Sequence, residues 1–190
     1  MSGLGQHRWQ IVMLPLVAAC GLALLGLLTL DERAHKRQVF EARLINEILG
    51  RDATAAPDWQ TLPALAAHPR VRRIRAAAPG LGTTEIWLGW REHGGYAGPV
   101  DLAVSFDDVG QIARVRLLRH TETPGLGDRL EHRNSDWLTQ FRGIAAPAKA
   151  HLRARQGQID AMSGATITSA AVARGVSRSL TAFIGTQRSH

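Results

Sequence analysis

The segment most suited to chemistry is 160–169, which reads DAMSGATITS and stands directly before a predicted helix. As a plain structural element it predicts a helix start, with Ser163 or Thr166 as the N-cap residue. The unpaired N–H groups and the positive dipole end of a helix start also suit a phosphate group beside Thr166. The segment has neither the Walker loop nor the Rossmann glycine pattern, so a free nucleotide is not indicated.

A second unusual segment is 122–128, which reads ETPGLGD and follows a predicted strand. Its proline and two glycines are typical of a tight turn. Glycine also allows the backbone to approach a flat or anionic ligand closely, because it has no Cβ. Both interpretations remain open on spacing alone.

Residues for other kinds of chemistry are not grouped in this sequence. The eight histidines are scattered from His7 to His190, without the i, i+4 pairing of a helical metal site. Neither a Ser-His-Asp set nor a pair of carboxylates is recognisable, so we expect no catalytic and no metal-binding residues. The single cysteine, Cys20, excludes a disulfide and an iron–sulfur cluster held within this sequence. Any redox chemistry would therefore need a different cofactor.

The segment 11–30 contains no formally charged residue, and its length suits a membrane-spanning helix. A cleaved signal peptide would have a shorter apolar core. The stretch Val17–Cys20 resembles a lipoprotein processing site, but ten mostly apolar residues follow it. We therefore predict a retained anchor followed by one domain, consistent with 190 residues that are 45% hydrophobic and 21% charged.

Charge gives conflicting indications about orientation and partners. More positive residues follow the apolar segment than precede it, which favours a cytoplasmic domain, although long domains often cross the membrane regardless of flanking charge. The formal net charge is +7, and the densest basic cluster is 70–75. That cluster lacks interleaved aromatic residues for base stacking, so we interpret it as a solvated face or a lipid headgroup contact.

The hydrophobic pattern predicts an α+β domain. A helix at 39–49 ends at Gly50 and forms a stalk, whereas 51–80 is predicted to be mainly loop. Alternating residues then predict antiparallel strands, and a helix capped by Ser135 carries Trp137 and Phe141. The predicted strands and last helix are 85–90, 100–106, 112–120 and 167–184. The predicted domains are 1–10 as an N-terminal tail, 11–30 as a single transmembrane helix, 31–50 as a helical stalk, and 51–190 as an antiparallel-sheet domain with packed helices.

Residues 160–169 resemble the flavinylation motif of the FMN-binding domain family. This family is shared by the G subunit of the Rnf (also called Rsx) electron transport complex and the C subunit of the sodium-translocating NADH:quinone reductase. The resemblance implies that FMN is joined through its phosphate to Thr166. It also implies that a flavin transferase, which moves FMN from FAD, recognises Asp160, Ser163, Gly164 and Ala165.

Three further segments resemble the Rnf G subunit in order and spacing: 95–100, 119–128 and 135–137. By this resemblance we expect the flavin ring to contact Glu122, Thr123, Gly125 and Leu126. The resemblance also implies a single-pass subunit of the bacterial inner membrane, with the N-terminal tail 1–10 in the cytoplasm and its domain on the periplasmic side. It implies the other Rnf subunits as partners. This placement is preferred to the charge count because flavinylation of this type takes place outside the cytoplasm.

The expected function is electron relay by covalent FMN, within an oxidoreductase complex that moves ions across the membrane and without a stand-alone catalytic site in this chain. The alternative is a membrane-anchored binding module that uses its basic surface on anionic lipid or nucleic acid without redox activity. By the resemblance, nucleic acid is not an expected partner.

Overall fold

The computed structural model describes residues 13, 15–21, 36, 38–52, 55, 58–123, 130, 136–145 and 150–188. By its internal contacts the chain divides into two compact units, Met1–Ile45 and Asn46–His190. Of the predicted span 11–30, only residues 13 and 15–21 are described, and they are helical. No helix within the described residues is both long enough and apolar enough to cross a bilayer. The transmembrane helix therefore stays a prediction.

The helix predicted at 39–49 is present, because residues 38–49 are helical in the structure. Gly50 follows with φ +70°, a left-handed conformation that glycine adopts without steric cost, so the predicted end of the helix is confirmed. In its last turn, Ile48 and Leu49 are buried. The backbone oxygen of Glu47 accepts a hydrogen bond from Arg114 at 3.3 Å.

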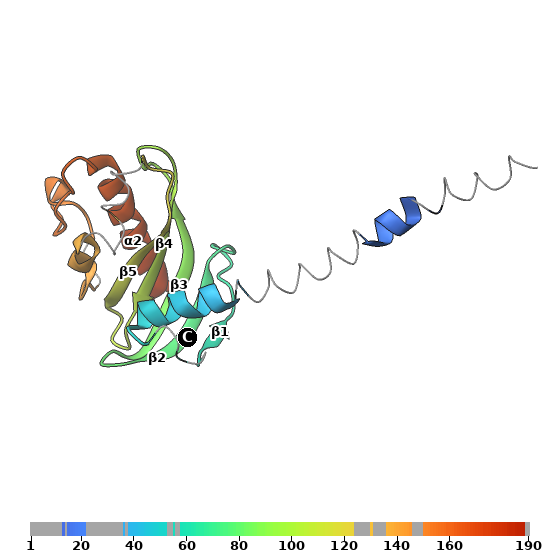
Figure 1. The fold of residues 1–190 in the computed structure, drawn as a ribbon. Helices are drawn as coiled ribbons and strands as arrows, with labels where there is room; N and C mark the ends of the chain where they lie inside the picture. The colour runs from blue at the N-terminus through green and yellow to red at the C-terminus, as the bar shows by residue number, and fades with distance from the viewer. Residues whose placement is uncertain are drawn as a thin grey trace, which may run out of the picture. The chain divides into compact units, whose positions relative to one another are not determined.

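The main element is a five-stranded antiparallel sheet in which neighbouring strands in sequence are neighbours in space. The confirmed α+β fold follows from this meander and the helices packed beside it (Figure 1). Its order is β1-β2-β3-β4-β5. The strands are β1 (Gln60–Leu62), β2 (Arg72–Ala78), β3 (Gly82–Glu92), β4 (Val100–Phe106) and β5 (Ile112–Arg119).

Two of these strands correct the prediction that 51–80 is mainly loop. The basic cluster lies largely on β2, and Arg73 is buried rather than solvated. Its Nε donates to Oε1 of Glu85 at 2.7 Å, and its guanidinium lies 5.8 Å from the ring centroid of Trp87. An ion pair and an aromatic face thus compensate the burial of this arginine, and neither partner is close to it in sequence.

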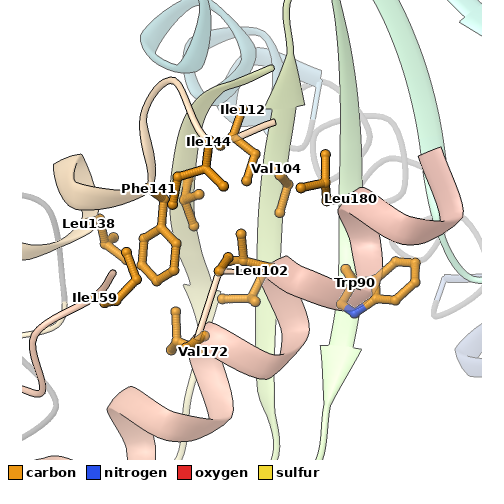
Figure 2. Close-up of a cluster of buried hydrophobic side chains, with 14 of the residues drawn as sticks. Trp90, Leu102, Val104, Ile112, Leu138, Phe141, Ile144, Ile159, Val172 and Leu180 are labelled. Atoms are coloured by element: carbon orange, nitrogen blue, oxygen red, sulfur yellow. The ribbon is translucent and has the colours of Figure 1, made fainter. Parts of the chain in front are cut away.

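Helix α2 (Thr166–Gln187) covers one face of the sheet and contacts β3 and β4. Its predicted apolar stripe is confirmed, because Val172, Val176, Leu180 and Phe183 are all buried. Figure 2 shows Val172 and Leu180 facing Leu102 and Val104 of the sheet. Burial of these side chains is the main force that fixes the helix on the sheet.

A short 3₁₀ helix, η2 (Trp137–Phe141), completes the core beside β5. Trp137, Leu138 and Phe141 are buried, and Figure 2 shows Phe141 among the core side chains. Ser135, the predicted cap, lies outside the described residues, and Asp136 occupies the N-cap position. A second 3₁₀ helix, η3 (Arg153–Arg155), precedes the segment that leads to α2.

Candidate functional site

Helix α2 begins without a side-chain cap. Its N-cap residue is Ala165, which has no side-chain hydrogen-bond acceptor, so the prediction of Ser163 or Thr166 as N-cap is wrong. Gly164 precedes it with φ +80°, and this turn is closed by a bond from the Ala165 N–H to the oxygen of Met162 at 3.0 Å. No side chain caps the helix, so the unpaired N–H groups of its first turn lie at its positive end without a capping acceptor.

The first two threonines of α2 lie in opposite environments. Thr166 is exposed, whereas Thr168 is 1% exposed. The Thr168 hydroxyl accepts a hydrogen bond from the backbone N–H of Tyr96 at 3.2 Å. Thr166 is therefore accessible from solvent, while the hydroxyl of Thr168 is engaged inside the fold.

Ser169 holds the loop before α2 against the helix. Its hydroxyl donates to the oxygen of Ala165 at 2.8 Å and accepts from the N–H of Met162 at 3.1 Å. The Ser169 side chain is fully buried. These contacts leave Ser163 and Gly164 exposed at the tip of the turn, next to Thr166.

A pocket of about 400 Å³ opens at this helix start. Small-molecule sites in proteins commonly have volumes of about 300–1,000 Å³. Its lining comes from segments far apart in the sequence, namely Tyr96, Glu122, Leu130, Gly164, Ala165, Thr166, Ile167 and Thr168. The mixture of hydroxyl, carboxylate and apolar groups suits a ligand with one anionic end and one flat apolar part.

The loop after β3 forms the other side of the pocket. The carboxylate of Glu122 accepts from the N–H of Ala97 at 3.3 Å, and the Thr121 hydroxyl donates to the oxygen of Ala97 at 2.9 Å. A Cβ at Gly95 would lie 2.5 Å from the oxygen of Gly98 and 2.9 Å from the Glu122 carboxylate. Glycine is therefore required at Gly95 for this close packing.

A buried acid secures the entry to the same loop. Glu92 has a side chain only 4% exposed, and it forms ion pairs with Arg178 at 3.2 Å and with Arg174 at 3.5 Å. Arg174 also donates to the backbone oxygen of His93 at 3.2 Å. Two arginines of α2 thus bind the helix to the end of β3, and Arg174 also binds the start of the loop that carries Tyr96.

The predicted site residues do not all lie at this pocket. Glu122, Gly164, Ala165 and Thr166 line it, with Ser163 next to them in the turn. Asp160 lies at the start of the segment, where its carboxylate pairs with Nε of Arg153 at 2.6 Å. Thr123 is exposed and is not among the lining residues, and Gly125 and Leu126 lie outside the described residues.

Sequence reasoning did not identify Tyr96, Leu130 or Ile167 as site residues, although all three line the pocket. Tyr96 is 70% exposed and Ile167 is 54% exposed, which is unusual for large apolar side chains. The only signal in the sequence was that Tyr96 stands in a glycine-rich stretch that matched the family motif.

Comparison with known protein families decides the class of this site. The model of the FMN-binding domain family matches residues 95–181, which include the loop with Tyr96, β4, β5 and the start of α2. The candidate site lies within the region that matches this family. The matched range contains every predicted site residue, and it assigns FMN as the cofactor class of the domain.

Individual relatives of the FMN-binding domain share one name, the G subunit of the ion-translocating oxidoreductase complex. That protein from Escherichia coli K12 is 43% identical over 88 residues, covering 44% of this chain and 43% of the relative. The one from Salmonella typhi is 43% identical over 121 residues, covering 55% of this chain and 59% of the relative. The chain thus matches about half the length of these relatives, and the resemblance to the Rnf G subunit is confirmed.

The residues of the FMN-binding domain fit this cofactor. The uncapped helix start offers N–H groups to a phosphate, beside the exposed hydroxyl of Thr166. Tyr96, Leu130 and Ile167 supply apolar surface for a flat ring. The Gly95 contact keeps the loop close to Glu122, so that the pocket wall holds its shape.

Proposed function

We propose that this chain is a membrane-anchored flavoprotein that carries FMN covalently on Thr166. The observation that carries the proposal is the exposed hydroxyl of Thr166 at an uncapped helix start, opening into a pocket within the matched FMN-binding region. The neighbouring hydroxyl of Thr168 is buried and engaged, which supports Thr166 as the point of attachment.

Attachment is a phosphoester transfer from FAD by a separate flavin transferase. The Thr166 oxygen forms a bond to the FMN phosphorus, the pyrophosphate bond of FAD breaks, and AMP leaves as the hydroxyl loses its proton. Exposure of Ser163 and Gly164 beside Thr166 supports recognition of this turn by a second protein. A covalent link also removes the translational entropy cost of retaining the cofactor.

Bound FMN supplies one- and two-electron redox chemistry, and the chain's own residues bind and orient it. The N–H groups at the start of α2 would stabilise its phosphate. Tyr96 and Ile167, which line the pocket, would contact its ring and exclude water from part of it, and Glu122 holds the loop that carries Tyr96. Glu122, Thr123, Gly125 and Leu126 stay proposed ring contacts.

We further propose that the flavoprotein is an oxidoreductase subunit that relays electrons within a membrane complex and couples their transfer to ion translocation. The names of the relatives support this role. Its proposed partners are the other subunits of an Rnf-type complex. The uncharged run 11–30 supports a single anchor in the bacterial inner membrane, and periplasmic placement of the domain follows from the proposed flavinylation.

The alternative of a basic binding module has less support in the fold. Arg73, Arg174 and Arg178 form ion pairs with the buried acids Glu85 and Glu92, so these cations stabilise the domain.

The proposal is tested by expressing the full chain with and without a flavin transferase. We expect acid-precipitated, denatured protein to stay yellow only after coexpression, with an intact mass increased by one FMN minus one water. Thr166→Ala serves as the matched control and should remain colourless. Colourless wild-type protein from cells that contain an active transferase would refute covalent attachment.

A further inference from the structure

Two side chains of η2 bind the backbone of Asp160, at the start of the attachment segment. The indole N–H of Trp137 donates to the oxygen of Asp160 at 2.6 Å. The side-chain oxygen of Gln140 accepts from the N–H of Asp160 at 2.9 Å. Both backbone groups of one loop residue are therefore bound by side chains from an element 20 residues or more away in sequence.

Further contacts leave this arrangement little freedom. The ring of Trp137 is 8% exposed and packs edge-to-face on Phe141, with centroids 5.4 Å apart. Gln140 is held by its own amide, which donates to the oxygen of Trp137 at 3.3 Å. The indole of Trp137 is thus fixed by core packing, and the side chain of Gln140 is held by a second hydrogen bond.

The segment is also held on both sides of Asp160. Ile159 is fully buried, and its backbone exchanges hydrogen bonds with His151 and Arg153 at 3.1 and 2.8 Å. On the other side, the N–H of Met162 is bound by the hydroxyl of Ser169. Between these anchors, Ala161, Ser163 and Gly164 are exposed.

We propose that Trp137 and Gln140 are positioning residues that present the attachment segment, and so Thr166, to the flavin transferase. This inference rests on the proposed function, since it concerns the same site. A loop that is already ordered loses less conformational entropy when a second protein binds it. Trp137 and Gln140 therefore affect how readily the exposed hydroxyl of Thr166 is modified, although neither of the two side chains lines the pocket.

The variants needed for a test alter the side-chain groups that bind Asp160. Trp137→Phe removes the indole N–H and retains an aromatic ring against Phe141. Gln140→Met removes both the acceptor for the Asp160 N–H and the amide that donates to the oxygen of Trp137. Trp87→Phe is the matched control, because its indole N–H donates to Glu85 at 2.7 Å and its ring contacts Phe183, at the far end of α2.

The first measurement is the initial rate of FMN incorporation into full-length apo-protein, followed by intact mass with FAD and the transferase. We expect Trp137→Phe and Gln140→Met each to slow it about three- to tenfold, the size expected for one lost hydrogen bond. Trp87→Phe should load at close to the wild-type rate. Wild-type rates in both Trp137→Phe and Gln140→Met, or equal slowing in Trp87→Phe, would overturn the proposal.

The second measurement needs no flavin. Amide hydrogen exchange of residues 160–165 in the apo-protein should be faster in Trp137→Phe and Gln140→Met, and unchanged in Trp87→Phe. Unchanged exchange in the first two variants would overturn the positioning role. If the wild-type chain never gained FMN while exchange changed as expected, the proposed function would fail and the structural role would stand.

Discussion

The buried hydroxyl of Thr168 accepts a hydrogen bond from the backbone N–H of Tyr96, 3.2 Å away across 72 residues of sequence. This bond joins the start of α2 to the loop after β3, so it directly connects two segments that line the pocket. Thr168 therefore has a structural task that is distinct from the one proposed for Thr166, two residues earlier on the same helix.

Thr166→Ala should abolish covalent FMN and leave the fold intact. The Thr166 side chain is exposed, and it makes no capping bond at the start of α2. Intact mass and denatured absorbance measure the loss of flavin, and a denaturant midpoint measures stability, which should change by less than about 0.5 kcal/mol. A mass increase of one FMN in this variant would contradict Thr166 as the site.

Thr168→Ala should retain most of the flavin but lower stability. The partly buried hydrogen bond from the N–H of Tyr96 is lost, and such a bond typically contributes about 0.5–1.5 kcal/mol. Thr168→Val, which preserves the side-chain volume, distinguishes the lost hydrogen bond from a packing defect and should be destabilised to a similar extent. Loss of covalent FMN from well-folded Thr168→Ala protein would argue against the assignment to Thr166.

Tyr96→Ala should leave FMN attached but change its surroundings. Because Tyr96 lines the pocket and its side chain is 70% exposed, we expect an altered visible absorbance and a shifted flavin reduction potential in the folded protein. Val109→Ala is the control, since Val109 is similarly exposed but lines a different pocket. A wild-type spectrum and potential in Tyr96→Ala would exclude Tyr96 as a ring contact.

Gly175→Val should destabilise the domain through a clash between α2 and the sheet. A Cβ at Gly175 would lie 2.8 Å from Cδ1 of Leu102 and 3.0 Å from Cβ of Glu92. Overpacking of this kind costs about 1–3 kcal/mol, measured as a lower denaturant midpoint. At Gly185 of the same helix, a Cβ meets no atom within 4 Å, so Gly185→Val should cost much less. Equal losses at the two positions would contradict close packing at Gly175.

Local pattern was enough to predict several elements. The predicted strand 100–106 coincides with β4, because alternating apolar residues are typical of a strand; Ala103 and Ser105 on its other face are buried as well. The apolar stripe of α2 was also predicted correctly, because its four buried side chains recur at helical spacing in the sequence. Strand β2 was missed because Arg73 is charged, and a charged residue does not indicate a buried strand face. Arg73 is buried beside Glu85 and Trp87, two residues of the next strand that pair with its charge and pack on it.

The sequence by itself determined the cofactor class and supplied the proposed attachment residue, because the motif around Thr166 is a continuous segment that a transferase would recognise locally. Only the tertiary structure decided which side chains surround that residue. The meander brings Tyr96 and Glu122 to the start of α2, and η2 brings Trp137 and Gln140 to Asp160. These neighbours are set by the burial of apolar faces between distant segments, a cooperative property of the whole domain.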